Sequence, residues 1–132
     1  MTKKLQRAVA GCLLGCLLSV VCIPVFASSY NIKFDFDSKL YGQTRYYENG
    51  DEFTISTDAR CDVTTSFDVK LYKVKKKNDI MGYYVDKSFN SANMSDSCIL
   101  DGDGPGYYYT VFIKPKKTYG KYCVGKGTIS DE

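Results

Sequence analysis

Few residues of this chain have the types and spacing that catalysis requires. The chain has no histidine, which excludes Ser-His-Asp and Cys-His nucleophile systems, histidine-ligated metals and an imidazole pH switch. Glycosidases need only two carboxylates, and Asp35 and Asp37 share one face of an expected strand. That face lies opposite Phe34 and Phe36 and is therefore solvated. Acid pairs contributed by separate loops are not visible in a sequence, but we expect a non-enzymatic protein without a cofactor.

Two carboxylates in a glycine-rich segment are the candidate metal ligands. Asp101 and Asp103 flank Gly102, and carboxylates at this spacing can converge on one calcium ion. Pro105 follows instead of a further ligand, and the terminal Glu of an EF-hand loop is absent. The segment is more typical of a glycine-rich turn.

Cysteines could form one disulfide after export. Three of the six cysteines lie in residues 1–27, which leaves Cys61, Cys98 and Cys123. An odd number permits at most one intrachain bridge and leaves one thiol over. The sequence does not fix the pairing. We favour Cys61–Cys98, because both lie in polar, turn-rich stretches, whereas Cys123 lies in a strand-like run.

Adjacent tyrosines are the residues best suited to binding a partner. They occur as Tyr46-Tyr47, Tyr83-Tyr84 and Tyr107-Tyr108-Tyr109. Neighbours on a strand point to opposite faces, so one ring of each group faces away from a single core. We expect Tyr47, Tyr84 and Tyr108 to point outward, where they could stack on sugar rings or dock a protein. The alternative is ordinary strand propensity with cross-strand aromatic pairing.

Lysines cluster in two expected turns, at Lys75, Lys76 and Lys77 and at Lys116 and Lys117. If the two turns lie at the same end of the fold, they form a basic patch suited to an anionic polymer. The alternative is solvated charge that protects an edge strand. Residues 28–132 carry 15 basic and 15 acidic side chains, and this balance together with export argues against a nucleic-acid partner.

Residues 1–27 have the pattern of a secretory signal peptide. A start with Lys3, Lys4 and Arg7 precedes a continuous apolar run, and Val25 and Ala27 place small residues at the −3 and −1 positions of a cut after Ala27. We expect a signal-peptide helix, cleavage near Ala27 and a secreted protein without a stable membrane anchor. An uncleaved anchor and lipoprotein processing at Cys12 or Cys16 are weaker interpretations.

The elements that must position these residues are strands. Residues 28–132 contain 2 alanines and 3 leucines, against 20 Val, Ile and Thr residues and 18 Tyr and Phe residues. Apolar and polar residues alternate along Ile32–Asp37, Glu52–Thr57, Phe67–Tyr72 and Tyr107–Lys114. This period of two is typical of half-buried strands. The pattern predicts one all-β domain, a small antiparallel sandwich of jelly-roll type with seven or eight short strands.

The connections between the strands follow from turn residues. Asn49-Gly50 predicts a two-residue hairpin, and Pro115–Gly120 predicts a second hairpin between the last long strands. The polar segment Lys87–Ser97 is typical of a loop.

Two resemblances bear on function. Tyr119–Val124 resembles the Tyr-Gly-Asn-Gly-Val-x-Cys box of pediocin-like bacteriocins, but no later cysteine follows Cys123 as that box requires. The strand pattern resembles small secreted jelly-roll domains, a likeness that carries no functional residue. We therefore expect a module that binds a cell-surface glycan or protein. The alternative is a secreted antagonist, a bacteriocin-like or toxin-like effector.

Overall fold

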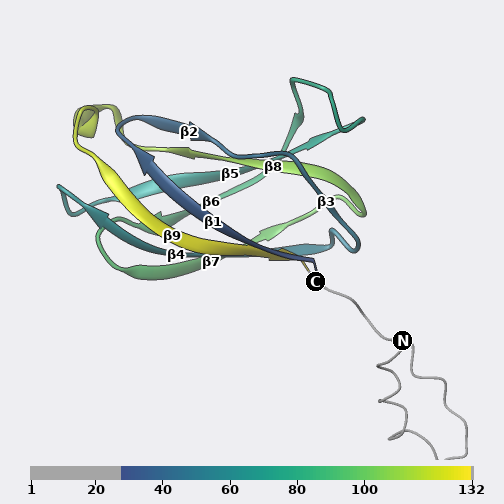
Figure 1. Ribbon diagram of the computed structural model, residues 1–132, viewed down its shortest axis with the longest axis horizontal. Coiled ribbons are helices and arrows are strands. Elements are labelled where there is room, and N and C mark those ends of the chain that lie inside the picture. The colour runs from purple at the N-terminus through teal and green to yellow at the C-terminus, as the bar shows by residue number, and fades with distance from the viewer. Residues whose placement is uncertain (1–27, 132) are drawn as a thin grey trace, which may run out of the picture.

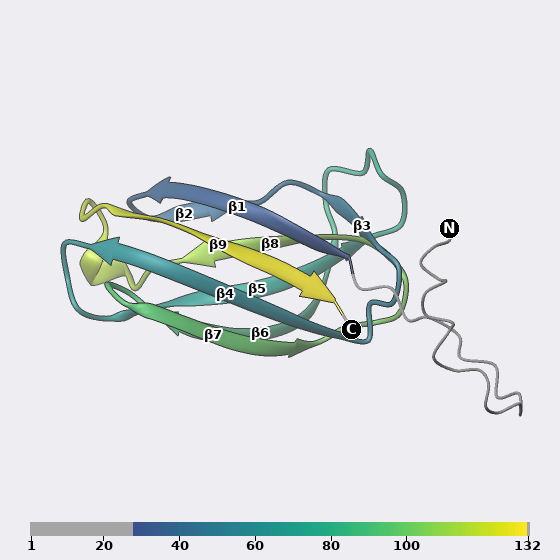
Figure 2. The same ribbon diagram turned by 60° about the horizontal axis from the view of Figure 1, so that its bottom comes forward.

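Two antiparallel sheets packed face to face make up the described part of the protein (Figures 1 and 2). The computed structural model describes residues 28–131. The expected signal-peptide helix and cleavage position therefore lie outside the described residues, at 1–27. No helix within residues 28–131 has the length and apolar character needed to cross a membrane.

The strands pair in a nested order. The four-stranded sheet has the order β1 (Ser29–Phe36), β9 (Cys123–Asp131), β4 (Glu52–Cys61), β7 (Ser95–Asp101). The five-stranded sheet has the order β2 (Lys39–Tyr41), β8 (Gly106–Ile113), β5 (Ser66–Val74), β6 (Tyr83–Ser91), and β3 (Arg45–Tyr47) also pairs with β8. Early strands thus pair with late ones, and the prediction of an all-β sandwich is confirmed, although residues 28–131 form nine strands rather than the seven or eight expected.

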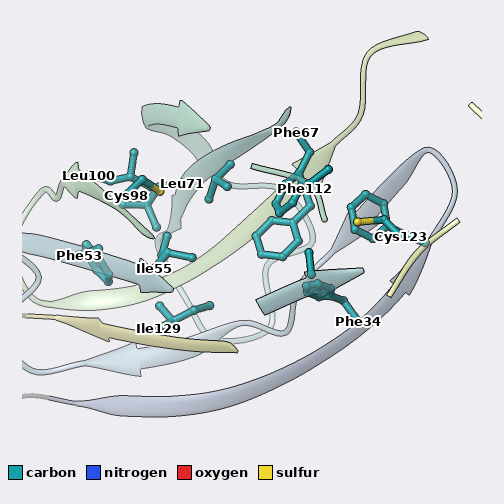
Figure 3. Close-up of a cluster of buried hydrophobic side chains, with 14 of the residues drawn as sticks. Phe34, Phe53, Ile55, Phe67, Leu71, Cys98, Leu100, Phe112, Cys123 and Ile129 are labelled. Atoms are coloured by element: carbon teal, nitrogen blue, oxygen red, sulfur yellow. The ribbon is translucent and has the colours of Figure 1, made fainter. Parts of the chain in front are cut away.

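Side chains at every second position fill the space between the sheets. On β4 the buried residues include Phe53 and Ile55, and on β5 they include Phe67, Val69 and Leu71, as the alternation predicts. Figure 3 shows how residues of both sheets meet in this core. The surface removed from water contributes on the order of 1.5–3 kcal/mol for each such side chain.

Four phenylalanines hold the sheets together at one end of the core. Phe34 and Phe36 of β1 meet Phe67 of β5 and Phe112 of β8, with every pair of ring centroids between 5.1 and 6.3 Å apart. All six contacts are edge-to-face or tilted, the arrangements that aromatic quadrupoles favour. The interlocked rings fix the position of β8 and β5, whose opposite faces are exposed to solvent.

The Asn49-Gly50 segment is not a hairpin, contrary to the sequence prediction. It leaves β3 in the five-stranded sheet and enters β4 in the four-stranded sheet. The backbone amides of Asn49 and Gly50 donate to Oδ2 of Asp131, at 2.7 and 2.9 Å. Gly50 has φ +66°, a conformation that glycine adopts without steric cost. The turn residues were therefore recognised, but the partner strands were wrong.

Two further connections differ from the prediction. Pro115–Gly120 passes from β8 to β9 through the 3₁₀ turn η2 (Lys116–Thr118) and so also crosses between sheets. Lys87–Ser97 is not a loop, because β6 continues to Ser91 and β7 starts at Ser95. Its polar sequence suits strands at the sheet edges, where most of these residues are exposed or half-buried. The inward Asn90 is an exception, and its Nδ2 donates to Ile55 O and Thr57 Oγ1 within the core.

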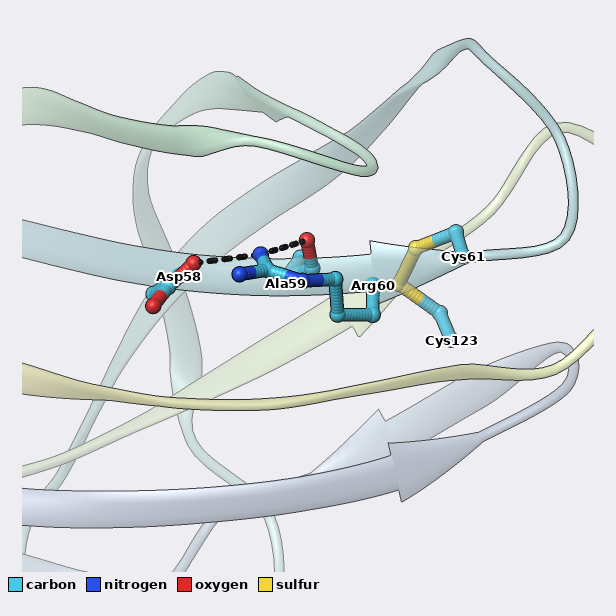
Figure 4. A network of polar contacts seen from close by, with 5 residues as sticks. All are labelled: Asp58, Ala59, Arg60, Cys61 and Cys123. Atoms are coloured by element: carbon cyan, nitrogen blue, oxygen red, sulfur yellow. Dashed lines mark hydrogen bonds and ion pairs between the residues drawn. A yellow bond between two sulfur atoms is a disulfide. The ribbon is translucent and has the colours of Figure 1, made fainter.

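The disulfide joins Cys61 to Cys123, and the predicted Cys61–Cys98 pairing is wrong (Figure 4). Cys61 ends β4 and Cys123 begins β9, and the two residues are direct partners in the register. Their Cα atoms are 4.0 Å apart. Cys98 lies in the core beside Leu100 as a buried thiol. Sheet register therefore decided the pairing, which turn-rich surroundings do not predict.

Candidate functional site

The outer surface of the five-stranded sheet carries a set of aromatic side chains, which we call the aromatic face. On β5 and β8 the residues that alternate with the core point to solvent, and their partners in β2, β3 and β6 extend the surface. Its members are Tyr41, Tyr46, Tyr72, Tyr84, Phe89, Tyr107 and Tyr109. The strands thus present the rings on one rigid surface rather than on loops.

A ladder of three tyrosines crosses the strands of this face. Tyr109 of β8 is the register partner of Tyr72 of β5, which in turn is the partner of Tyr84 of β6. The Tyr72 and Tyr109 rings stack with centroids 5.2 Å apart, and the Tyr72 and Tyr84 centroids are 6.1 Å apart. Burial by these neighbours raises the pKa of Tyr72. Tyr84 remains 54% exposed at the end of the ladder.

Further rings extend the face on both sides of the ladder. Tyr46 of β3 packs edge-on against its partner Tyr107, with centroids 5.1 Å apart. Tyr41 of β2 lies beside Val111, and Phe89 lies beside Asp68. Tyr41, Tyr46 and Phe89 are all exposed. Cross-strand aromatic pairs stabilise a sheet, but that stabilisation does not require the rings to remain solvent-exposed.

Two lysines of the aromatic face are direct cross-strand partners. Lys70 of β5 faces Lys87 of β6 in the register, on the same outer side as Tyr72 and Tyr84. Like charges directly opposite one another destabilise a sheet. Lys39 of β2 adds a third positive charge, against the single carboxylate of Asp68. The face therefore holds excess positive charge among its rings, an arrangement suited to a ligand with negative groups.

The outer face of the other sheet differs in chemistry. The outward residues of β4 include Thr54, Ser56 and Asp58, which alternate with the buried core. Asp58 forms an exposed ion pair with Arg60, at 2.8 Å, and this interaction lowers the pKa of Asp58 (Figure 4). No outward strand position of this sheet, within residues 28–131, holds an aromatic residue. The aromatic residues on the outer sheet surfaces are thus concentrated on one side.

Tyr47 and Tyr108 point inward, and their assignment as surface residues is corrected. Both are buried, and the Tyr108 ring lies 4.6 Å from that of Phe53 and 6.0 Å from that of Tyr47. Burial raises the pKa of both phenols. The outward rings are the neighbours, Tyr46 in one group and Tyr107 and Tyr109 in the other. β8 has apolar side chains on both faces, so its sequence did not show which side was buried.

The two lysine clusters do not form one patch. In the antiparallel β5–β8 pair, Val74 lies opposite Tyr107 and Asp68 lies opposite Ile113. Lys75, Lys76 and Lys77 leave the sheet beside the start of β8, whereas Lys116 and Lys117 follow its end. The clusters therefore lie at opposite ends of the sandwich (Figure 1), and the predicted common basic patch is corrected.

The candidate calcium segment accepts hydrogen bonds from side chains of neighbouring strands at Asp103. Asp103 accepts a hydrogen bond from the Tyr83 hydroxyl, at 2.6 Å, and its carbonyl accepts one from Lys73 Nζ. Residues 28–131 contain no group of three acidic, cysteine or histidine side chains that could hold a metal. Asp101 ends β7, and Asp103 lies in the connection between β7 and β8.

The sequence analysis found only Tyr84 among the outward rings that we now place in the site. It missed Tyr72 and Tyr109 as members of the ladder, and Lys70 and Lys87 as a charged pair. Tyr72 alternates with the buried Leu71, which is a signal in the sequence, but pairing across strands is visible only in the register. No protein-family model matches the chain, and no curated protein matches it at a significant level.

Proposed function

We propose that this protein is an exported, non-enzymatic binding module that recognises an acidic polysaccharide at a cell surface through the aromatic face. The observation that carries the proposal is the Lys70–Lys87 pair within a field of exposed tyrosines. The lysine pair destabilises an isolated sheet, and cross-strand pairing of the tyrosines does not require rings that stay exposed to water. Together they match a ligand that offers both flat sugar rings and negative groups.

The rings account for sugar binding. Tyrosine provides a large rigid surface with little loss of conformational entropy, and its hydroxyl keeps the surface wetted when no ligand is present. The Tyr109–Tyr72–Tyr84 ladder spans three neighbouring strands, which lie about 4.7–4.9 Å apart. A row of this length suits more than one sugar unit, and its open surface suits a polymer rather than an enclosed small molecule.

The lysines account for the choice of an acidic polymer. An anionic group between Lys70 and Lys87 would relieve their mutual repulsion and gain charge-assisted hydrogen bonds. Because these ammonium groups are at the surface, added salt should weaken the interaction. The protein is neutral over residues 28–132, so this attraction is local to the face.

The architecture is compatible with this function. The nested strand order resembles a jelly roll, an arrangement that also occurs in lectin domains. Fold alone does not imply function. The Cys61–Cys123 disulfide and the leader pattern support an exported protein.

A comparison of charged and neutral forms of one polymer tests the proposal. A panel of polysaccharides that carry uronate, sulfate or phosphate groups first shows which acid binds most tightly. Polygalacturonate and its methyl ester then provide the charged and the neutral form of one polymer. The protein should be retained on acidic polymers, with weaker retention at high salt, and should pass over the ester. Equal retention on both forms would contradict charge recognition, and capture by a protein alone would contradict glycan recognition. Growth inhibition of related cells without polysaccharide binding would favour the antagonist.

A further inference from the structure

A buried carboxylate lies beside the first residue that follows the expected signal-peptide cut. Asp131, at the end of β9, is fully buried. Its Oδ1 accepts a hydrogen bond from the backbone nitrogen of Ser28, at 2.6 Å, and its Oδ2 accepts from Asn49 and Gly50. Ser28 is also held by its carbonyl, which accepts from the Asp131 amide at 3.1 Å, and by its hydroxyl, which accepts from Glu48 N at 3.3 Å.

The carboxylate of Asp131 has amide donors but no ion-pair partner within residues 28–131. Burial of an unpaired charge is costly, and three neutral N–H donors offset only part of that cost. The position nearest Oδ1 is a main-chain nitrogen. This nitrogen is neutral while Ser28 is joined to Ala27, and it becomes cationic when that bond is cut.

We propose that the Ala27–Ser28 peptide bond is the processing site and that the new α-ammonium group of Ser28 forms a buried ion pair with Asp131. A peptidase of the export machinery would catalyse addition of one water molecule across the bond. The water oxygen joins the carbonyl carbon of Ala27 and the C–N bond breaks. Both water protons end on the Ser28 nitrogen, which leaves a carboxylate on Ala27 and an ammonium on Ser28. Removal of the leader thereby stabilises the sandwich.

The other charged groups around this pair do not replace the ammonium. The charges of Arg45 and Asp131 both affect the pKa of Tyr47. The charges of Asp51 and Asp131 both raise the pKa of Tyr108. Glu48 is an exposed residue of the β3–β4 connection. Tyr47 and Tyr108 themselves are neutral, because burial raises their pKa. Asp51 and Glu48 favour a cation at Ser28 N and Arg45 opposes one, but Arg45 forms no ion pair with Asp131 within residues 28–131 and so does not replace the ammonium.

The first experiment exports the full chain from a secreting host and examines the protein that is released. Its intact mass should correspond to Ser28–Glu132. The rate at which the α-amine is acylated should then be measured against pH, in the folded and the denatured protein. The folded amine should have a pKa at least one unit above the ordinary value of about 7.7–8.0, which lowers its rate near neutral pH by about tenfold or more. A different first residue, or equal rates in the two states, would overturn the proposal.

A variant with one alanine inserted between Ala27 and Ser28 is the matched control. The variant keeps Val25 and Ala27 at the −3 and −1 positions of the cut. It also keeps the Asp131 carboxylate and the Ser28 amide that donates to it, but its ammonium group lies one residue earlier in the chain. Its α-amine should titrate at the ordinary pKa and its Tm should be lower. Asp131→Asn should likewise return the amine of the uninserted protein to its ordinary pKa. The proposal is wrong if the insertion leaves both the amine pKa and the Tm unchanged.

The pH dependence of stability provides a further distinction. A group whose pKa is higher in the folded state stabilises the protein fully below its unfolded pKa and loses this effect as the pH rises through the folded pKa. The processed protein should therefore lose Tm above about pH 8 relative to the insertion variant. Parallel Tm curves would contradict the ion pair. This inference concerns Ser28 and Asp131 and does not depend on the aromatic face.

Discussion

Tyr72 and Tyr109 stack face to face on the outer surface of the five-stranded sheet, with ring centroids 5.2 Å apart and planes inclined by only 6°. Each residue covers one face of the other ring, and Tyr84 packs against Tyr72 from the next strand. The stacked pair therefore holds the ladder in place, while Tyr84, Tyr41 and Phe89 offer exposed aromatic surface. This division separates rings that mainly support the face from rings that are free to meet a ligand.

Alkaline pH should unfold the protein through its protected tyrosines. Burial raises the pKa of Tyr47, and a hydrogen bond to Asp103 raises that of Tyr83 to about 12. Because these pKa values exceed the unfolded value of 10.0, the associated stability is present below pH 10 and decreases as the pH rises above it. Ultraviolet absorbance of tyrosinate and circular dichroism measured together should show late ionisation coinciding with unfolding. Complete ionisation of all tyrosines near pH 10 in a folded protein would contradict this.

The Tyr108 hydroxyl should contribute to stability and not to binding. It accepts from Asp103 N at 2.8 Å and donates to Gly104 O at 2.5 Å. Tyr108→Phe leaves both backbone groups without this partner and should reduce the free energy of unfolding by about 1–3 kcal/mol. Urea denaturation measures this loss. Tyr119→Phe, at an exposed position, is the control and should change stability by less than about 0.5 kcal/mol; similar losses in the two variants would refute the assigned role.

Gly102 should resist substitution because two turns are joined backbone to backbone. Gly102 N donates to Asp51 O at 2.8 Å and Gly104 N donates to Gly50 O at 3.0 Å. A Cβ atom at Gly102 would lie 1.8 Å from the Gly50 carbonyl oxygen, whereas one at Gly104 would meet nothing within 4 Å. Gly104→Ala should cost about 1–2 kcal/mol for its left-handed backbone, and Gly102→Ala should cost more. Equal urea midpoints for Gly102→Ala and Gly104→Ala would show that close contact between the two turns is not required for stability.

Thiol labelling should distinguish the cysteines. Burial raises the pKa of Cys98 to about 11, so its thiol should not react with an alkylating reagent in the folded protein at neutral pH. Unfolding of the protein that begins at Ser28, without reductant, should expose one reactive thiol, and peptide mapping should locate it at Cys98. Labelling of Cys61 or Cys123 under those conditions would disprove the bridge. Loss of the bridge in Cys123→Ser should reduce stability by about 3–4 kcal/mol, given the length of chain that it closes.

Local alternation predicted β1, β4, β5 and β8, but it missed the end of β6 and the start of β7 and did not predict strand partners. Phe53, Ile55, Phe67 and Leu71 were placed in the core because each lies on the apolar side of a half-buried strand. Asn49-Gly50 was recognised as a turn, yet its strands belong to different sheets, because the nested topology pairs residues far apart in the chain. The disulfide prediction was wrong for the same reason, since Cys61 and Cys123 are neighbours only through the β4–β9 register.

The candidate site shows the same limit at the level of single side chains. Tyr47 and Tyr108 were placed outside because a run of adjacent tyrosines gives no indication of which ring is buried. The ring contacts with Phe53 determine it in the structure. Lys70 and Lys87 are unremarkable in the sequence, and their functional interest comes only from being direct partners. Long-range pairing thus created the site, and local patterns could supply only some of its members.

Binding of an acidic polysaccharide by two matched pairs of variants tests the central claim most directly. Tyr84→Ala and Lys87→Gln alter the aromatic face, whereas Tyr122→Ala and Lys126→Gln alter exposed residues elsewhere; Tyr84 and Tyr122 are 54% and 57% exposed. Tm and the Kd for the tightest acidic polymer should be measured for all four. We predict that Tyr84→Ala weakens binding about tenfold, because it removes an exposed ring that contacts the sugar. Lys87→Gln should weaken binding and reduce its salt dependence, and neither control should change the Kd. Unchanged affinity in Tyr84→Ala and Lys87→Gln, or equal losses in all four variants, would contradict the account.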